Sequence, residues 1–472
     1  MSNQLNRQCV ADHFQQDPRV IQAKRLILDA LSAYQHQLAG PRPSISFLDT
    51  SCMALIEEAE KLRGRSLMLP YIGAGIGKGS LVELANGSVK YDFISGIGVH
   101  VLGHSHPALV VAAIDAALSD TIMQGNLQQN AEAVKLSREL CEIGNRKEAR
   151  FTHCFLATSG AMANENALKI VYQQKSPANR ILAFRGGFSG RTLALSQITD
   201  RPEYRHGLPE TMAVDYVPFF DPDRPMKSTN EASQNLRDHL QRHPHKHAVM
   251  VFELIQGEGG AYPGSREFFI TLMDILREHN VSIMIDEIQT FGRTTEPFAF
   301  QHFGLGEYVD VVTVGKLLQV CATLFTEKLN PSGPLLSQTF VGSTSAIFAA
   351  RAILRELLSG NYFGEEGKIL EFGNYFIDRL KSIQQRHPEV IAGPFGFGGM
   401  IAFTPFGGNQ KKAAQLVKAL FDDGVLCFIG GHKLSRVRFL IPYGAVCYED
   451  IDAVTVIVEQ TIRRLSNFRG ER

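Results

Sequence analysis

Lys316 is the residue of this sequence best placed for covalent chemistry, because it stands at the end of the apolar run 309–314. Burial there disfavours the charged ammonium, so the neutral amine becomes a nucleophile toward a carbonyl carbon. Asp286 and Glu287 stand at the end of another apolar run, 281–285, and a buried acid needs a partner. The separation between Asp286 and Lys316 fits one strand–helix–strand unit, so both could reach one pocket. A solvated lysine and an acid that caps a loop remain open as alternatives.

Small and acidic residues follow two further apolar runs. Ser159, Gly160 and Ala161 lead from a run into a segment with helical spacing, and small residues at a helix N-terminus let backbone N–H groups approach an anion. Glu253 and Glu258 come near the end of another run, beside a glycine-rich stretch. Ligands of an open parallel sheet collect at the carboxyl ends of its strands. These strand ends together predict one shared site, whereas each alone would fit a tight turn or solvated acids.

Short apolar runs alternate with amphipathic segments through the middle of the chain. The runs are rich in Val, Ile, Phe and Met, lack period-two alternation, and cover residues 152–158, 180–184, 248–255, 281–285 and 309–314. This pattern is typical of strands buried on both faces of a largely parallel sheet. Ser265 can cap a helix between two of these runs. The predicted class is therefore α/β, with helices layered on the sheet.

The two ends of the chain have a different character. Residues 1–66 have helix-like composition, and residues 81–93 predict two strands about an Asn-Gly turn. The C-terminal part changes to helices near 365–386, near 411–422 and from Glu449, with a glycine-rich strand region between them. This change predicts a separate C-terminal α+β domain.

Composition and charge argue against two classes of partner. Lys plus Arg and Asp plus Glu both number 48, so the balanced charge gives no long-range attraction to nucleic acid or an anionic membrane. The seven cysteines are scattered without ligand spacing, which predicts reduced thiols in a cytoplasmic protein and no bound metal. No segment has the pattern of a secretory signal or a membrane span. Neither nucleic acid nor membrane is therefore an expected partner.

Several segments, taken together and in order, resemble the class III pyridoxal-phosphate aminotransferases, the group of ornithine, acetylornithine, 4-aminobutyrate and lysine-6 aminotransferases. They are 91–98 with 103–107, 159–169, 188–192, 253–260, 286–289 with 291–294, and 315–316. Their joint occurrence is more specific than any one of them. The resemblance implies fold type I, with a large domain over 108–360 and a smaller α+β domain that combines 67–107 with 361–472. Residues 1–66 lie outside it and form a predicted N-terminal helical extension.

The resemblance implies pyridoxal 5′-phosphate as the cofactor and gives roles to four residues around its ring. Lys316 would hold the cofactor as a Schiff base and carry a proton between substrate and cofactor. Asp286 would pair with the pyridinium nitrogen, which keeps the ring an electron sink. Gln289 would bond the phenolic oxygen of the ring, and Phe188 would stack on its face.

The resemblance also implies which residues bind the phosphate of the cofactor. Ser159, Gly160 and Ala161 would hold the phosphate at the start of a helix. Thr339 corresponds to a threonine that reaches the phosphate of the neighbouring subunit. The resemblance therefore implies a homodimer in which each active site is completed by the partner.

Two arginines are the candidates for substrate carboxylates, because a planar guanidinium binds a carboxylate through two hydrogen bonds. By resemblance, Arg191 would bind the donor carboxylate far from the reacting amine. Arg438 would bind the α-carboxylate of glutamate or 2-oxoglutarate, and Glu258 would neutralise Arg438 when an ω-amine occupies the site. Arg436 competes with Arg438 for this role. Ile97 falls where ornithine-specific relatives carry a tyrosine, which tells against ornithine.

The predicted function is a ping-pong transfer of an amino group to 2-oxoglutarate. The donor is an ω-amino compound of the lysine, 4-aminobutyrate, acetylornithine or ornithine type, and the substrates are a small amino donor and a 2-oxo acid. The same fold also supports aminomutases and racemases, which is the alternative. A binding protein that kept the scaffold is less favoured, because the lysine and the acid expected to serve the cofactor are both present.

Overall fold

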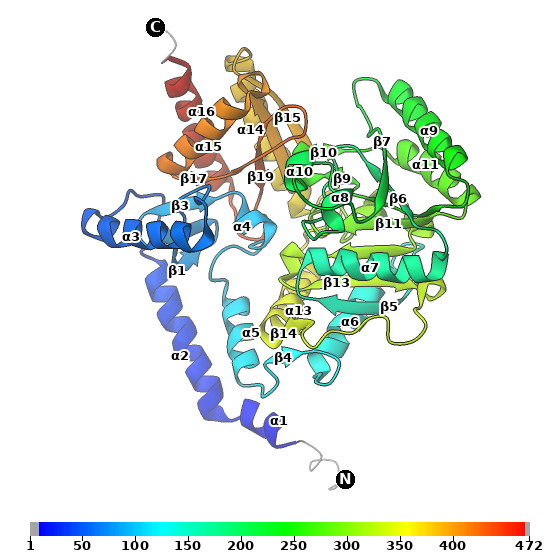
Figure 1. Cartoon of the computed structure of the whole chain (residues 1–472). Coiled ribbons are helices and arrows are strands. Elements are labelled where there is room, and N and C mark those ends of the chain that lie inside the picture. The colour runs from blue at the N-terminus through cyan, green and yellow to red at the C-terminus, as the bar shows by residue number, and fades with distance from the viewer. Residues whose placement is uncertain (1–8, 468–472) are drawn as a thin grey trace.

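A single seven-stranded sheet forms the centre of the computed structural model, which describes residues 9–467 (Figure 1). The strand order is β5, β13, β12, β11, β8, β6, β7. Neighbours are parallel except where β13 meets β12 and β5. The bounds are β5 Phe151–Ala157, β6 Arg180–Phe184, β7 Ala213–Val217, β8 His247–Phe252, β11 Ser282–Glu287, β12 Val311–Val314 and β13 Cys321–Thr326. The predicted, mostly parallel sheet is thereby confirmed, although β7 and β13 were not among the predicted runs.

Helices cover both faces of this sheet, because successive side chains of a strand point to opposite faces. Ile181 and Val249 belong to the core that includes α7, whereas their neighbours Leu182 and Met250 belong to the core with α6, α11 and α13. Ser265 caps α11 as predicted, with its Oγ accepting from the N–H of Phe268 at 3.2 Å. The helices here are α5 Pro107–Ala117, α6 Ala131–Gly144, α7 Gly160–Lys175, α8 Leu195–Ile198, α9 Pro225–Arg242, α10 Gly257–Gly260, α11 Arg266–Glu278, α12 Ala299–His302 and α13 Thr344–Ser359.

Segments from both ends of the chain form a second core. β3 pairs in parallel with β17, and Phe93, Phe376 and Phe439 are buried in one cluster. The β2–β3 pair is antiparallel, which confirms the predicted hairpin. The elements are β1 Gly73–Lys78, β2 Leu81–Leu84, β3 Val89–Asp92, β15 Ile391–Phe397, β16 Met400–Pro405, β17 Val425–Leu426, β18 Phe428–Gly430, β19 Arg436–Leu440, α14 Lys368–Arg386, α15 Gln410–Asp423 and α16 Tyr448–Asn467. A smaller α+β domain from both chain ends is therefore present, while its exact boundaries stay a prediction.

The N-terminal segment consists of helices α1 (Val10–Gln15), α2 (Pro18–Gln35) and α3 (Ser46–Arg63). α2 extends away from the body as a long rod (Figure 1), and none of its residues is buried. An ion pair between Lys24 and Asp115 ties it to α5. No helix between residues 9 and 467 is both long and apolar enough to cross a membrane.

Short elements connect these parts of the fold. They are α4 Ser95–Gly98, β4 Met123–Gln124, β9 Ile255–Gln256, β10 Tyr262–Pro263 and β14 Gly342–Ser343. The run predicted over 248–255 is thus divided, since β8 ends at Phe252 and β9 pairs separately with β10. The break leaves Glu253 at the edge of the sheet, where its side chain bonds two backbone N–H groups.

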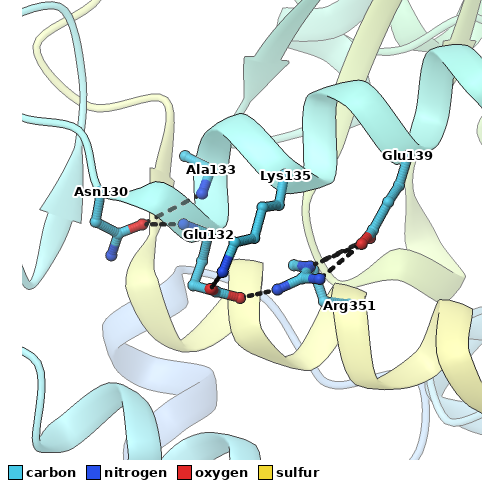
Figure 2. Close-up of polar contacts among 6 residues, drawn as sticks. All are labelled: Asn130, Glu132, Ala133, Lys135, Glu139 and Arg351. Carbon is cyan, nitrogen blue, oxygen red and sulfur yellow. Dashed lines mark hydrogen bonds and ion pairs between the residues drawn. The ribbon is translucent and has the colours of Figure 1, made fainter. Parts of the chain in front are cut away.

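Arg351 of α13 joins that helix to α6 (Figure 2). Its Nη2 donates to Glu139 at 2.6 Å, its Nε lies 3.2 Å from both Glu139 oxygens, and its Nη1 bonds Glu132. Asn130 caps α6 by accepting from the N–H groups of Glu132 and Ala133. Because α13 also packs on the turn that carries Lys316, this network helps to support the candidate site.

We expect Arg351→Met to lower the free energy of unfolding by about 1–3 kcal/mol, because half-buried Glu139 loses its cationic partner and half-buried Glu132 loses one of its two. Lys135→Met is the matched control, since Lys135 bonds Glu132 at 2.8 Å from a side chain that is 49% exposed. An exposed pair of this kind contributes less than about 1 kcal/mol. Thermal unfolding followed by circular dichroism measures both changes. Equal midpoints for the two variants would contradict a structural role for Arg351.

Candidate active site

The carboxyl ends of β8, β11 and β12 meet at one edge of the sheet. In the parallel pair β11–β12, Asp286 is opposite Thr313, and the chain reaches Lys316 directly after β12 ends. Ser159 stands between β5 and α7, whose residue Asn164 bonds Asp286. Glu253 follows β8, which neighbours β11. The structure therefore brings all the predicted strand ends to a common edge.

Asp286 is buried there, and within residues 9–467 no cationic side chain lies at salt-bridge distance from it. Its Oδ2 accepts from Asn164 Nδ2 at 2.7 Å and its Oδ1 from the N–H of Ile288 at 3.0 Å. Burial raises the pKa of Asp286 to about 6, although these hydrogen bonds oppose the shift. Asn164 is itself fixed, because it donates to the carbonyl of Ser189 at 2.8 Å and accepts from Thr313 at 2.7 Å. Sequence reasoning did not single out Asn164, and a buried amide within a helix was the available signal.

The neighbouring acid, Glu287, serves a different purpose. Its Oε2 accepts from the N–H of Ala299 at 2.7 Å and its Oε1 from the N–H of Phe300 at 2.8 Å. It therefore caps the start of α12 on the opposite face of β11 from Asp286. The sequence singled out both acids. In the structure Asp286 lies at the edge of the candidate site, whereas Glu287 accepts hydrogen bonds from backbone N–H groups of α12.

Lys316 has a backbone conformation that is rare for a residue other than glycine, and the pKa of its side chain is lowered. Its φ of 41° lies in the left-handed region, and strained residues of this kind cluster at functional sites. Burial lowers the pKa of Lys316, and the positive charges of Arg438 and Arg293 lower it further, while Glu258 and Asp286 oppose them. The side chain lines a cavity of about 310 Å³. A buried amine facing open space can attack a carbonyl carbon.

The start of α7 provides a place for an anion. Ser159 caps the helix, with its Oγ accepting from the N–H of Met162 at 3.2 Å. At Gly160 a Cβ would lie 2.9 Å from Ile288 Cγ2, so only glycine allows the helix to begin this close to β11. The sixteen-residue helix adds partial positive charge at this end. Ser159, Gly160 and Ala161 therefore stand as the sequence predicted, at a helix N-terminus.

Arg438 and Glu258 form an ion pair beside Lys316. Arg438 Nη2 donates to Glu258 Oε1 at 2.7 Å, with the arginine 2% and the acid 24% exposed. Arg438 Nη1 also donates to Gln289 Oε1 at 3.2 Å. Burial opposes ionisation of Glu258, but the charge and hydrogen bond of Arg438, together with the charges of Lys316 and Arg201, lower the pKa of Glu258. Arg436 is directed elsewhere, since it bonds the carbonyl of Gly260 and lies on aromatic rings.

Glu253 ties the surrounding backbone together. Its Oε2 accepts from the N–H of Phe188 at 3.0 Å and its Oε1 from the N–H of Gly257 at 2.9 Å. Burial, reinforced by the charge of Asp286, raises the pKa of Glu253 to about 8. This carboxyl group therefore positions Phe188, the residue expected to stack on the cofactor ring, relative to the loop that carries Glu258.

Arg191 is exposed and has no carboxylate partner within residues 9–467. Its guanidinium lies 3.7 Å from the centre of the Tyr204 ring, and that ring also meets Phe188 edge-on at 6.5 Å. Tyr204 thus connects the candidate donor-binding arginine to the candidate stacking residue. The sequence analysis missed Tyr204, because it lies in a short turn with no apolar pattern.

Ile97 lies in a backbone turn with positive φ at every position from Ser95 to Gly98. A β-branched residue rarely adopts a φ of 63°. Buried Arg293 holds this turn, because its Nη2 donates to the carbonyl of Gly98 at 2.6 Å and its Nε to the carbonyl of Gln289 at 3.1 Å. Arg293 was not predicted as a site residue, although it couples the Ile97 turn to Gln289.

Thr339 stands apart from the other candidates. It is exposed in the segment before β14 and packs by its backbone against Gly125, where a Cβ would meet the Thr339 carbonyl oxygen at 1.9 Å. In the described part of this chain no hydrogen bond links its side chain to the strand-end site. The structure of one protomer therefore does not bring Thr339 to the site.

The residues present fit a cofactor with an anionic end, a basic ring nitrogen and an aldehyde carbon. The helix start at Ser159 suits the anion, and Lys316 suits the aldehyde. Asp286 is the decisive fit, because this buried carboxylate has no cation within salt-bridge distance among residues 9–467. A protonated ring nitrogen would supply the missing charge.

Comparison with known proteins identifies the family. The model of the family described as aminotransferase class-III matches residues 68–462. The chain is 30% identical over 405 residues to an acetylornithine aminotransferase of Methanocaldococcus jannaschii, covering 82% of this chain and 93% of that protein. It is 30% identical over 385 residues to a succinylornithine transaminase of Yersinia pseudotuberculosis, covering 76% and 85%. The chain therefore belongs to the class III aminotransferases.

A solved structure supports the same fold. Lysine aminotransferase from M. tuberculosis matches with a TM-score of 0.77 at 23% identity, covering 87% of this chain and 99% of that one. The fold expected from the sequence, a fold type I enzyme with a large and a small domain, is confirmed. The family match begins at residue 68, so helices α1 to α3 lie outside it.

Proposed function

We propose that this aminotransferase binds pyridoxal 5′-phosphate and moves the amino group of an ω-amino donor to 2-oxoglutarate by a ping-pong mechanism. The observation that carries the proposal is the Arg438–Glu258 pair beside Lys316. With Glu258 neutralising it, Arg438 leaves room for a donor that has no carboxylate next to its reacting amine. If Glu258 swings away, the freed guanidinium can bind the α-carboxylate of 2-oxoglutarate or glutamate.

The cofactor supplies the carbonyl carbon that exchanges the amino group and a ring that spreads the negative charge of the reacting carbon. Lys316 would hold the cofactor at that carbon, and its amine is the group placed to carry the proton at the substrate carbon. Asp286, oriented by Asn164, keeps the ring nitrogen protonated. The start of α7 holds the phosphate, and Gln289 bonds the ring oxygen. Each role uses a group whose position and partners are described above.

We further propose that the enzyme is a homodimer in the cytoplasm, with Thr339 completing the partner's phosphate site. An exposed threonine away from its own site suits that role. We also propose that residues 108–360 form the large domain and that residues 67–107 and 361–472 together form the small domain.

The donor is proposed to be of the ornithine or lysine type. Two relatives bear the names acetylornithine aminotransferase and succinylornithine transaminase, so an N-acylated ornithine is the favoured donor. Lysine, 4-aminobutyrate and ornithine are the other candidates. Arg191 would hold the donor carboxylate, with Tyr204 fixing the guanidinium from one side.

We expect at least one of these donors to yield glutamate from 2-oxoglutarate, and Arg191→Ala to reduce kcat/KM for it by about 10- to 100-fold. This range corresponds to about 1.5–3 kcal/mol for lost hydrogen bonds to a charged group. Glutamate release measures the effect. Putrescine, a diamine without a carboxylate, is the control donor and should be insensitive to Arg191. Activity confined to such amines would refute the donor assignment.

The same assay distinguishes transfer from the aminomutase and racemase alternatives. With donor alone, a transaminase stops after one turnover per site, because no 2-oxo acid removes the amino group. A mutase or racemase continues to convert the donor. Sustained conversion without 2-oxoglutarate would therefore overturn the proposed function.

A further inference from the structure

Glu258 has a second guanidinium group beside it. Its carboxylate pairs with Arg438, whereas its backbone carbonyl accepts a hydrogen bond from Arg201 Nη2 at 3.2 Å. Burial opposes ionisation of Glu258, and the positive charge of Arg201 adds to those of Arg438 and Lys316 in lowering the pKa of this carboxyl group. The carboxylate therefore lies in the field of two arginines and contacts one of them.

Half-buried Arg201 is held in place by backbone groups of two segments. The same Nη2 donates to the carbonyl of Gly431 at 2.5 Å, and the N–H of Gly431 donates to the carbonyl of Glu258 at 2.9 Å. Gly431 follows β18 of the smaller domain, whereas Glu258 belongs to α10 near the central sheet. The guanidinium is therefore fixed where the two parts of the fold meet.

The rest of the Arg201 guanidinium is not engaged by another part of the described chain. Within residues 9–467, Arg201 forms no ion pair, and neither its Nε nor its Nη1 has a hydrogen-bond partner. The adjacent acid, Asp200, is directed elsewhere, because its Oδ2 accepts from the N–H of Gly186 at 2.8 Å. Arg201 therefore has N–H groups to donate and no acid that occupies them.

The proposed switch at Arg438 creates a need for such a group. When Glu258 leaves Arg438 so that a substrate carboxylate can bind there, a side chain that is 24% exposed loses its counter-charge. A partly desolvated carboxylate without a partner is unfavourable. Rotation about the χ1 and χ2 torsions of Glu258 moves its carboxylate around its own backbone, to which Arg201 is bonded. Lys316 is the other nearby cation, but the proposed function requires its amine at the cofactor.

We propose that Arg201 is the second partner of Glu258 and binds its carboxylate during the half-reaction in which Arg438 holds 2-oxoglutarate or glutamate. This inference rests on the proposed aminotransferase function and makes Arg201 a positioning residue, because it acts through Glu258 and not on the substrate. A guanidinium already held by two carbonyls loses little further freedom when it binds the carboxylate. Glu258 then alternates between two arginines, one for each half-reaction.

The test compares Arg201→Gln, which keeps an N–H donor for the carbonyls but loses the charge, with Arg201→Lys, which keeps the charge. Single-turnover absorbance of the cofactor follows each half-reaction, with 2-oxoglutarate or glutamate in one and the most active of the candidate donors named above in the other. We expect Arg201→Gln to raise the half-saturating concentrations of 2-oxoglutarate and glutamate about tenfold, as for a lost hydrogen bond to a charged group. Arg201→Lys should raise them less. Half-saturation by the donor should stay within about twofold of wild type, because Glu258 remains on Arg438. The calorimetric dissociation constant of glutarate, a dicarboxylate that cannot react, should rise in parallel with that of 2-oxoglutarate.

A double-mutant cycle with Glu258→Gln separates this role from a structural one. Glutamine has no charge that needs a second partner, so adding Arg201→Gln to Glu258→Gln should change half-saturation by 2-oxoglutarate by less than about twofold. If Arg201 only joined the two segments, its loss would have the same effect in both backgrounds and would weaken the donor half-reaction equally. Either of these results overturns the inference.

Arg205→Gln is the matched control, because Arg205 follows in the same segment and its Nη1 donates to the carbonyl of Thr199 and to the Tyr216 hydroxyl, both at 3.0 Å. It should leave both half-reactions within about twofold of wild type. Unchanged half-saturation by 2-oxoglutarate and glutamate in Arg201→Gln overturns the inference while the aminotransferase stands. Failure of wild-type protein to react with glutamate at all overturns the proposed function itself.

Discussion

Lys316→Ala should reduce turnover by about 10³-fold or more, because the variant loses both the amine that binds the cofactor carbon and the group that moves the proton. Wild-type protein reduced with borohydride should carry the cofactor on Lys316, and peptide mass spectrometry locates the modified residue. Lys316→Arg keeps the positive charge but stays protonated at all relevant pH values. We therefore expect it to be as inactive as the alanine variant.

Lys90 is the matched control for this prediction. It is also buried, its Nζ donates to the carbonyl of Phe421 at 2.7 Å, and burial lowers the pKa of Lys90 as it does that of Lys316. Lys90 lies on β3 in the smaller domain, where the acids whose charges act on it are Asp422, which is exposed, and Asp423, which is half-buried. Lys90→Met should remain active, so burial alone does not make a reactive lysine. Borohydride labelling of Lys90, or loss of activity in Lys90→Met alone, would contradict the assignment of Lys316.

The Lys316→Ala variant can also show whether each active site contains residues of both subunits. A Lys316→Ala protomer mixed with a Thr339→Ala protomer should form some hybrid dimers with one undamaged site, because the two defects then fall in the same site. Recovered activity after subunit exchange supports Thr339 acting in the partner. Persistent inactivity in confirmed hybrids would contradict a role for Thr339 in the active site of the partner subunit.

The central strands could be predicted because each one is a short run of mostly apolar residues that is visible in the local sequence. The runs over 152–158, 180–184 and 309–314 correspond to β5, β6 and β12. β6 and β12 are buried along almost their whole length, whereas β5 is buried at Phe151 and at its end. β7 was missed because it is an edge strand interrupted by Asp215. That acid is tolerated since Arg180 pairs with it at 2.8 Å from the neighbouring strand. Such compensation depends on strand order and is invisible in a local window.

The antiparallel strand β13 was missed for another reason. Its residues 321–326 follow the Lys316 turn after a very short connection, and the run mixes small and polar residues with apolar ones. Thr323 is fully buried in the middle of this strand, where its Oγ1 donates to the carbonyl of Ala163 in α7. A buried threonine satisfied by a helix carbonyl gives no apolar signal, so the strand emerges from tertiary contacts alone.

In the candidate site, too, some residues could be predicted from the local sequence and others only from tertiary contacts. Lys316 could be named because a lysine at the end of an apolar run is costly and therefore conspicuous. Arg436 and Arg438 could not be separated, because residues two apart on β19 share a face. Only the register of β19 against its neighbours sends Arg438 to Glu258 and Arg436 to Gly260.

Asp286→Asn should lower kcat by about 10²–10³-fold while leaving the cofactor bound, because a neutral amide no longer holds the ring nitrogen in its protonated form. The hydrogen bonds from Asn164 and Ile288 orient the side chain, so the substitution changes charge more than position. Asp286→Glu restores the charge on a longer side chain and should recover part of the rate. Cofactor occupancy is measured by absorbance and kcat by glutamate release.

Glu287→Gln is the internal comparison for this prediction, since both acids are fully or nearly fully buried at the end of β11. Glu287 accepts from the N–H groups of Ala299 and Phe300 and faces away from Asn164. Its loss should therefore lower the thermal midpoint, while kcat per folded, cofactor-loaded protomer stays within about threefold of wild type. Near-normal turnover in Asp286→Asn, or a larger kcat defect in Glu287→Gln than in Asp286→Asn, would assign the ring nitrogen to a different partner.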